Sequence, residues 1–166
     1  MNSTNIHASC VILAEAGKPF GLSHSGVLLL GASGSGKSDL ALRLIDRGCK
    51  LVADDRTNLF VRDDKLIASA PEKLAGLIEV RGVGIVEMPF ARESEIALVV
   101  ELVAVEDIPR LPEAERYTPP APLGLPEAAK PPRIRLTSFE ASAPAKILWA
   151  VRAFREALFR DERNPK

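Results

Sequence analysis

The feature that most constrains this chain is an eight-residue, glycine-rich segment, Gly31 to Ser38, which reads GASGSGKS. A continuous apolar run at residues 27–30 precedes it, as is typical of a strand that is buried on both faces. Residues 38–47, SDLALRLIDR, follow with apolar positions at helical spacing and a glycine after the last residue. The order of strand, glycine loop and helix predicts a loop whose amide groups converge on phosphate oxygens at a helix N-terminus.

This loop fits the pattern G-x-x-x-x-G-K-[ST], which indicates that it binds the phosphates of a nucleoside triphosphate. Its candidate phosphate-binding residues are Gly31, Ala32, Ser33, Gly34, Ser35, Gly36, Lys37 and Ser38. The ammonium group of Lys37 is expected to contact the β and γ phosphates. The hydroxyl group of Ser38 is expected to bind Mg²⁺, which takes oxygen ligands together with phosphates and water. A glycine loop without a ligand is the alternative, and the loop alone does not identify a reaction.

Length and composition limit the protein to which this loop can belong. With 166 residues, of which 46% are apolar and 27% charged, we expect a single domain over residues 1–166. The formal net charge of zero excludes a global basic field for nucleic acid or an anionic membrane. Cys10 and Cys49 lack metal-ligand spacing, and neither a signal sequence nor a membrane-length apolar stretch is present. We therefore expect a cytoplasmic protein with reduced cysteines in its core.

The remaining pattern predicts an α/β domain with a mixed sheet and flanking helices. Strands are expected at residues 7–14, 27–30, 50–53, 77–80, 82–88 and 96–105. A hairpin is expected over residues 57–70 with its turn at Asp63 and Asp64, and an amphipathic helix over residues 144–160. Prolines crowd residues 109–132, which predicts an irregular connection that is either disordered or wraps the domain.

Two adjacent carboxylates, Asp54 and Asp55, follow the strand at residues 50–53. They lie at the carboxyl edge of the sheet, where open α/β proteins bind ligands. Adjacent side chains of an extended strand face opposite sides, so at most one of the two is expected to point at the γ-phosphate. One carboxylate could hold Mg²⁺, and the other could accept the proton of an attacking hydroxyl group. The alternative is that both cap the strand in solvent.

A second charged pair, Glu79 and Arg81, interrupts the apolar, glycine-flanked stretch GLIEVRGVGIV at residues 76–86. Charged groups inside such a run need a partner or an ion. Glu79 is therefore a candidate metal ligand, and an internal ion pair with Arg81 is the alternative.

Three segments in this order, GASGSGKSD at residues 31–39, LVADD at 51–55 and EVRGVGI at 79–85, resemble the catalytic C-terminal domain of the HPr kinase/phosphorylase family. The resemblance implies a P-loop fold like that of phosphoenolpyruvate carboxykinases. It also implies that ATP and Mg²⁺ are used to phosphorylate a seryl side chain on HPr, the small carrier of the sugar phosphotransferase system, or on a relative of it. The family's hexamers imply a homo-oligomer. Because His7 already opens the catalytic part, we expect a short form without the family's N-terminal regulatory domain.

Individual roles follow from the matching positions. The resemblance makes Asp55 the proton acceptor and Lys37 the phosphate-binding lysine, and it makes Ser38 and Glu79 the ligands of Mg²⁺. Supporting candidates are Asp54 and Arg81.

His7 matches the histidine that starts the family's first catalytic strand, and it could help to bind inorganic phosphate in the reverse reaction. We interpret His24 as a surface residue. The arginine-bearing loop that the family places after the Glu79 region has no match here, and its role is not carried over to Arg133 or Arg135. The resemblance therefore implies the kinase direction and leaves reverse phosphorolysis of the phosphoserine open.

Three functions remain open from the sequence. A carrier-protein kinase predicts serine-dependent phosphate transfer to the carrier. A small-molecule kinase predicts transfer to a metabolite and none to a carrier protein. A non-catalytic, nucleotide-gated regulatory module predicts ATP binding without transfer, and the presence of Asp55 argues against it.

Overall fold

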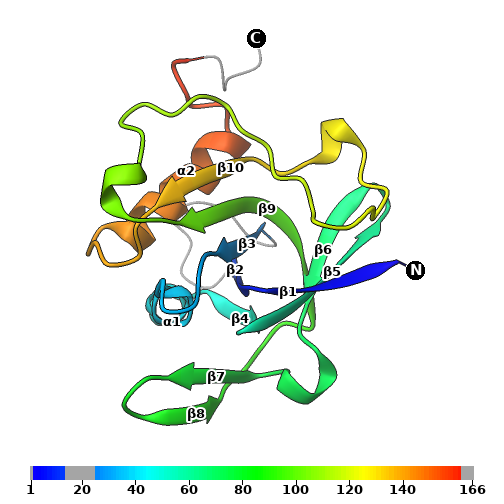
Figure 1. Cartoon of the computed structure of the whole chain (residues 1–166), viewed down its shortest axis with the longest axis vertical. Coiled ribbons are helices and arrows are strands. Elements are labelled where there is room, and N and C mark those ends of the chain that lie inside the picture. Colours follow the sequence, from blue (N-terminus) through cyan, green and yellow to red (C-terminus); the bar gives the residue numbers. More distant parts are fainter. Residues whose placement is uncertain (1, 14–24, 162–166) are drawn as a thin grey trace.

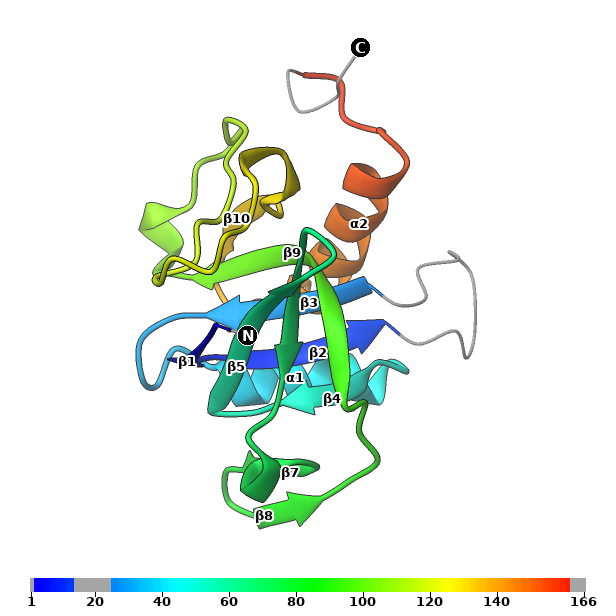
Figure 2. The ribbon, with the colours of Figure 1, turned by 90° about the vertical axis from the view of Figure 1, so that its right-hand side faces the viewer.

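The computed structural model describes residues 2–13 and 25–161, and Figures 1 and 2 show it from two directions. His24 lies outside the described residues. The strands and helices are, in chain order, β1 (Ser3–His7), β2 (Ser9–Leu13), β3 (Ser25–Leu30), α1 (Lys37–Asp46), β4 (Lys50–Ala53), β5 (Arg56–Arg62), β6 (Lys65–Ser69), β7 (Leu77–Val80), β8 (Gly84–Glu87), β9 (Glu93–Leu102), β10 (Arg133–Leu136) and α2 (Ala143–Arg155). Short 3₁₀ helices lie at Glu72–Leu74, Val105–Asp107 and Glu127–Ala129.

Eight strands form one mixed sheet in the order β1-β5-β6-β9-β3-β2-β4, with β10 beside β9. The ten-residue strand β9 joins the two halves of this sheet. Its first residues pair antiparallel with β6, and its later residues pair parallel with both β3 and β10. The strands β7 and β8 form a separate hairpin that projects from the sheet (Figure 1). The predicted α/β class with a mixed sheet is therefore confirmed.

Two apolar layers lie on the two faces of this sheet. Val27 and Leu29 of β3 belong to the layer that contains Leu44 of α1 and Ile147 of α2, whereas Leu28 belongs to the opposite layer. Both helices therefore cover the same face, and Figure 2 shows α1 behind β2 and β4. Each fully buried leucine contributes about 1.5–3 kcal/mol of transfer free energy. This packing fixes the end of β3 against the start of α1, and with it the loop between them.

The strand predicted over residues 7–14 is wrong as a single element, because the chain changes partners at Ala8. β1 pairs with β5 up to His7, whereas β2 pairs with β3 and β4 from Ser9 onward. Ala8 is fully buried between them. Its amide donates to the carbonyl oxygen of Asp55 at 3.2 Å, and its own carbonyl accepts from Thr57 Oγ1 at 2.9 Å. The crossing thus brings His7 to the chain segment that follows β4.

The predicted hairpin of residues 57–70 is confirmed by β5 and β6, which turn at Asp63 and Asp64 with left-handed φ angles of 51° and 59°. β9 begins at Glu93 instead of residue 96. The charged residues that open β9 alternate with buried ones and pair with β6 and β5 side chains, because Glu95 binds Lys65 at 2.8 Å and Glu93 binds Arg62. A search for continuous apolar residues misses this strand start, because every second residue there is charged.

The C-terminal helix is shorter than the predicted range of residues 144–160, because α2 ends at Arg155. Ala157 has a left-handed φ of 53°, and the amide of Leu158 donates back to the carbonyl oxygen of Ala153 at 3.0 Å. This hydrogen bond is the Schellman arrangement, which ends a helix while the apolar periodicity continues beyond it.

The proline-rich segment wraps the domain, which decides between the two alternatives left by the sequence. We call residues 109–132 the strap; Figure 1 shows it running from near β10 toward β5 and β6. Tyr117 of the strap is 8% exposed and packs in the apolar layer opposite the helices. Glu115 of the strap accepts hydrogen bonds from Arg133 at 2.6 Å and from Arg135 at 2.6 Å. The irregular segment is therefore held by specific contacts.

Replacement of Glu115 with Gln is expected to lower the free energy of unfolding by about 1 kcal/mol, because the charge-assisted hydrogen bonds from Arg133 and Arg135 are weakened. The loss is small because solvent partly screens these ion pairs. Hydrogen bonds from Arg133 and Arg135 lower the pKa of Glu115. The stabilisation is therefore present above the pKa that Glu115 has in the unfolded chain, and it is lost as the pH falls through the lower folded value. Urea unfolding at neutral and acidic pH measures both effects. Glu113→Gln is the control, because Glu113 is exposed. An equal loss of unfolding free energy in both variants would show that the contacts of Glu115 with Arg133 and Arg135 do not stabilise the strap.

Both cysteines are free and buried, as predicted for core residues. Burial raises the pKa of both thiols, that of Cys49 to about 11. In the described part of the chain, neither helix has the length and apolar character that crossing a membrane requires.

Candidate functional site

The direction of two strands places the glycine loop beside the acidic pair. β3 and β4 both run antiparallel to β2, so they are parallel to each other and their carboxyl ends lie at one edge of the sheet. The loop of residues 31–36 follows β3, and Asp54 follows β4. The parallel direction of β3 and β4 thus brings the glycine-rich loop and the two carboxylates to one edge of the sheet, where open α/β proteins bind ligands.

Within the loop, Lys37 is folded back over the backbone. Its Nζ donates to the carbonyl oxygen of Gly31 at 2.8 Å and to that of Ala32 at 3.0 Å, and the residue is only 6% exposed. Burial lowers the pKa of Lys37, while the charges of Asp55 and Asp54 act in the opposite direction. Both contacts are to neutral carbonyl oxygens, so an anion that replaced them would give the ammonium group a partner of opposite charge.

Gly36 allows a distant segment to close against the loop. It has a left-handed φ of 89°, and a Cβ atom at this position would lie 2.2 Å from Oγ of Ser138. That hydroxyl group donates to the carbonyl oxygen of Ser35 at 2.5 Å. Arg43 of α1 also binds the carbonyl oxygen of Ser138, and it binds that of Glu140 at 3.2 Å. The turn between β10 and α2 is therefore held by hydrogen bonds to both the loop and α1.

Replacement of Gly36 with Ala is expected to displace this turn and to weaken nucleotide binding at least tenfold, because the methyl group adds a clash to the cost of a left-handed backbone. Isothermal titration with ATP and thermal unfolding measure the two effects. Gly124→Ala is the matched control, since Gly124 also has a positive φ, 77°, but nothing lies within 4 Å of its added Cβ. Equal behaviour of the two variants would show that the close approach does not matter.

Asp54 is a buried hub below the loop, with 4% exposure. Its Oδ1 accepts hydrogen bonds from the hydroxyl groups of Ser9 and Ser38, both at 2.7 Å, and its Oδ2 accepts the amide of Glu79 at 3.3 Å. Asp54 therefore does not cap the strand in solvent. It ties β2, the start of α1 and β7 together and orients Ser38, the candidate ligand of Mg²⁺.

Asp55 takes the opposite direction because its φ of 63° is left-handed, so the extended strand ends before it. Its Oδ1 lies 3.1 Å from Nε2 of His7, and its side chain is 68% exposed. The two adjacent carboxylates thus point in different directions, but through the left-handed backbone of Asp55 and not through the alternation of an extended strand: Asp54 contacts Ser38, and Asp55 lies beside His7.

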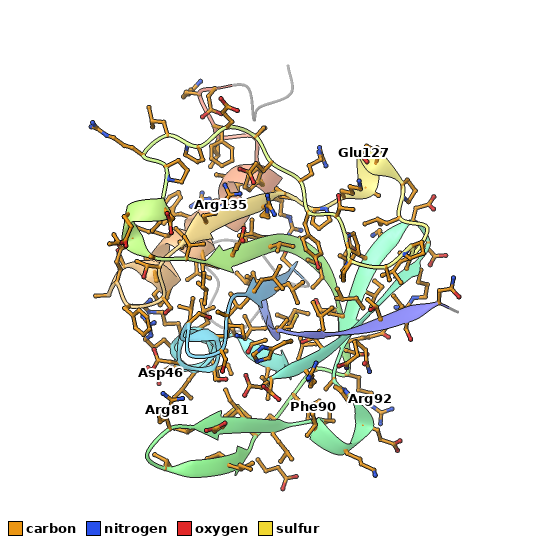
Figure 3. All side chains as sticks on the ribbon, in the orientation of Figure 1. Asp46, Arg81, Phe90, Arg92, Glu127 and Arg135 are labelled. Carbon is orange, nitrogen blue, oxygen red and sulfur yellow. The ribbon has the colours of Figure 1, made fainter. Side chains whose placement is uncertain are left out.

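A cavity of about 440 Å³ brings most of the candidate residues together. Its lining includes the loop residues Ser33, Gly34 and Gly36. The candidate catalytic and metal-binding side chains that line it are His7, Lys37, Ser38, Asp55, Glu79 and Arg81. Figure 3 shows Arg81 below α1 on the β7–β8 hairpin, whereas Arg135 lies across the molecule on β10. The candidate residues Gly31, Ala32, Ser35 and Asp54 are not among the residues that line the cavity.

The hairpin corrects one interpretation of the sequence. Glu79 and Arg81 are exposed, so neither needs an internal ion-pair partner. The apolar residues around them do not enclose the pair because β7 and β8 form a two-stranded hairpin outside the main sheet. Arg133 and Arg135 are also explained, since both bind Glu115 and lie within 4 Å of Glu101.

The donor groups fit a metal that arrives with a nucleotide. Within residues 2–13 and 25–161, no cluster of three or more His, Cys, Asp or Glu side chains could hold an ion alone. Mg²⁺ needs only one or two protein oxygens when phosphates and water supply the others. Ser38, which is fixed by Asp54, and the nearby Glu79 provide such a set.

Sequence reasoning missed four residues that build the site: Ser9, Arg43, Ser138 and Phe139. Ser9 lies within an apolar strand, where a buried serine signals an unseen polar partner. The other three gave no signal, because their contacts join segments that are about 100 residues apart in the chain.

A family model described as the HPr Serine kinase C-terminal domain matches residues 17–119. The HPr kinase/phosphorylase of Lactobacillus acidophilus is 44% identical over 86 residues, which cover 47% of this chain and 27% of that relative. The HPr kinase/phosphorylase of Clostridium tetani is 50% identical over 80 residues, which cover 48% and 26% of the two chains. The matched part thus spans about a quarter of the length of these curated relatives.

A solved structure, that of the Hpr(Ser) kinase/phosphatase from Coxiella burnetii, is similar over nearly the whole chain. The TM-score is 0.72 at 29% sequence identity, and the match covers 93% of this chain and 98% of the other. The likeness therefore extends past the segments that carry the sequence motifs.

Proposed function

This chain belongs to the family of the HPr serine kinase C-terminal domain, and from that membership we propose that it transfers the γ-phosphoryl group of Mg-ATP to a seryl hydroxyl group of HPr or a related phosphocarrier protein. The observation that carries the proposal is that the phosphate loop and the His7–Asp55 pair line the same cavity. A phosphoryl donor and a hydroxyl acceptor can be aligned between them.

The binding half of the reaction uses the loop. The amides of residues 31–38 hold the phosphates, and Lys37 exchanges its two carbonyl contacts for the β and γ phosphates. Ser38 and Glu79 would hold Mg²⁺, with Asp54 orienting Ser38 through the 2.7 Å hydrogen bond. The bound ion would neutralise charge on the phosphates during transfer.

The chemical half uses Asp55. As the seryl oxygen forms its bond to the γ-phosphorus, the bond from that phosphorus to the bridging oxygen of ADP breaks. The carboxylate of Asp55 takes the seryl proton. His7, 3.1 Å away, positions this carboxylate toward the cavity. In the reverse direction Asp55 would return the proton while phosphate attacks phosphoserine, and His7 would contribute to holding that phosphate.

The wider proposals follow the same family membership. We assign a fold like that of phosphoenolpyruvate carboxykinases, a cytoplasmic location in regulation of the sugar phosphotransferase system, and a hexameric or other homo-oligomeric assembly. The support for the first is the mixed sheet with the phosphate loop after β3 and the carboxylates after β4.

ADP release separates this proposal from its competitors. The protein is incubated with Mg-ATP alone, with an HPr-type carrier, and with a panel of hydroxylated metabolites. We expect release to depend on the carrier. Release that depends on a metabolite would favour a small-molecule kinase, and ATP binding without release under any condition would favour a regulatory module.

A further inference from the structure

An exposed aromatic ring lies at the same cavity and has no place in the chemistry described above. Phe139 is 74% exposed, although the two residues before it, Thr137 and Ser138, are buried. Its side chain lines the cavity together with the phosphate loop. A ligand that enters the cavity and covers this ring would supply the burial that the core does not, which is worth about 1.5–3 kcal/mol when complete.

The backbone around Phe139 is fixed, while its side chain is free of the core. Ser138 donates to the loop at the carbonyl oxygen of Ser35, and Arg43 binds the carbonyl oxygens of both Ser138 and Glu140, one on each side of Phe139. The ring edge lies against the loop, because a Cβ atom on Gly36 would be 3.4 Å from its Cε1. The ring is thus presented at a set place beside the phosphate site.

We propose that Phe139 is the stacking platform for the base of the bound nucleotide. This inference rests on the nucleotide binding proposed above. A triphosphate held by residues 31–38 has its base at the outer end, and a flat apolar face beside the loop suits a flat heterocycle. The hydrogen bond from Ser138 to Ser35 couples this platform to the loop, and the hydrogen bonds from Arg43 couple it to α1. The phosphates and the base are therefore bound by one rigid unit.

Stacking on a ring face reads the size of a base but not its hydrogen-bonding edge. The inference therefore predicts that ATP and GTP bind with similar affinity and that CTP and UTP bind more weakly. It also predicts that inorganic tripolyphosphate, which has no base, is indifferent to residue 139.

The test compares the dissociation constants of ATP and tripolyphosphate for the whole chain and for Phe139→Ala. We expect ATP to bind roughly tenfold more weakly to the variant, tripolyphosphate to bind unchanged, and Phe139→Trp to restore ATP binding. Leu111→Ala is the control, since Leu111 is also highly exposed, at 84%, and is not among the residues lining the cavity.

Unchanged ATP affinity in Phe139→Ala would overturn the inference, as would an equal loss for ATP and tripolyphosphate, which would mean a disturbed loop. If Phe139→Ala raised only the KM for the carrier protein, the ring would be an acceptor contact and the inference alone would fail. If the unaltered chain bound neither ATP nor tripolyphosphate, the proposed function would fail with it.

Discussion

Replacing Asp55 with Asn should lower the rate of phosphate transfer to the carrier by about 10²–10⁴-fold while leaving ATP affinity nearly unchanged, because an amide cannot accept the seryl proton. Asparagine tolerates the left-handed backbone at this position, where φ is 63°. The side chain is also 68% exposed, so the fold should be kept. Single-turnover transfer of labelled γ-phosphate, together with titration of ATP, separates the chemical step from binding.

Asp64→Asn is the matched control for this variant. Asp64 also has a left-handed φ, 59°, but it lies in the turn between β5 and β6 and is not among the residues lining the cavity. The control should transfer phosphate at the normal rate. Normal transfer by Asp55→Asn would mean that another group takes the proton, and an equal loss in both variants would mean that the aspartate backbone geometry, not the carboxylate, is at fault.

Replacing Lys37 with Met should weaken ATP binding by on the order of 10–100-fold, because a hydrogen bond to a charged group is lost where the loop meets the phosphates. Methionine has a similar length and fits a buried position, and Lys37 is 6% exposed. Isothermal titration with ATP measures the affinity. Circular dichroism should show that the fold is retained.

Lys50→Met serves as the control, since Lys50 is exposed at the start of β4, at the end of that strand opposite Asp54. ATP should bind to the control as it does to the unaltered chain. Undiminished ATP binding by Lys37→Met would contradict the assignment of the loop as the phosphate site, whatever happened to transfer.

The parts of the fold that were predictable depend on local patterns. The loop at residues 31–38, the helix after it and the hairpin turn at Asp63 and Asp64 are each set by a few neighbouring residues. The crossing at Ala8 was not predictable, because its partners are the carbonyl of Asp55 and the hydroxyl of Thr57, far along the chain. The start of β9 likewise depended on distant partners, because Glu93 and Glu95 pair with Arg62 and Lys65 about 30 residues earlier in the chain.

The candidate site shows the same division. The adjacency of Asp54 and Asp55 indicated two different directions, yet only the left-handed φ of Asp55 determines which carboxylate faces His7. The exposure of Glu79 on a separate hairpin was hidden by its apolar neighbours in the sequence. Phe139 carries no signal of its own, since its position depends on contacts from Arg43 to the residues on either side of it.

The central claim is most directly tested by the transfer of labelled γ-phosphate from Mg-ATP to a purified HPr-type carrier and to the same carrier with its target serine changed to alanine. We expect one labelled phosphate on the serine of the intact carrier and none on the alanine form. In the time in which the unaltered chain labels the carrier once, we expect no detectable labelling by Asp55→Asn. No labelling of any carrier by a chain that binds ATP through Lys37, or labelling that does not depend on the serine, would contradict it.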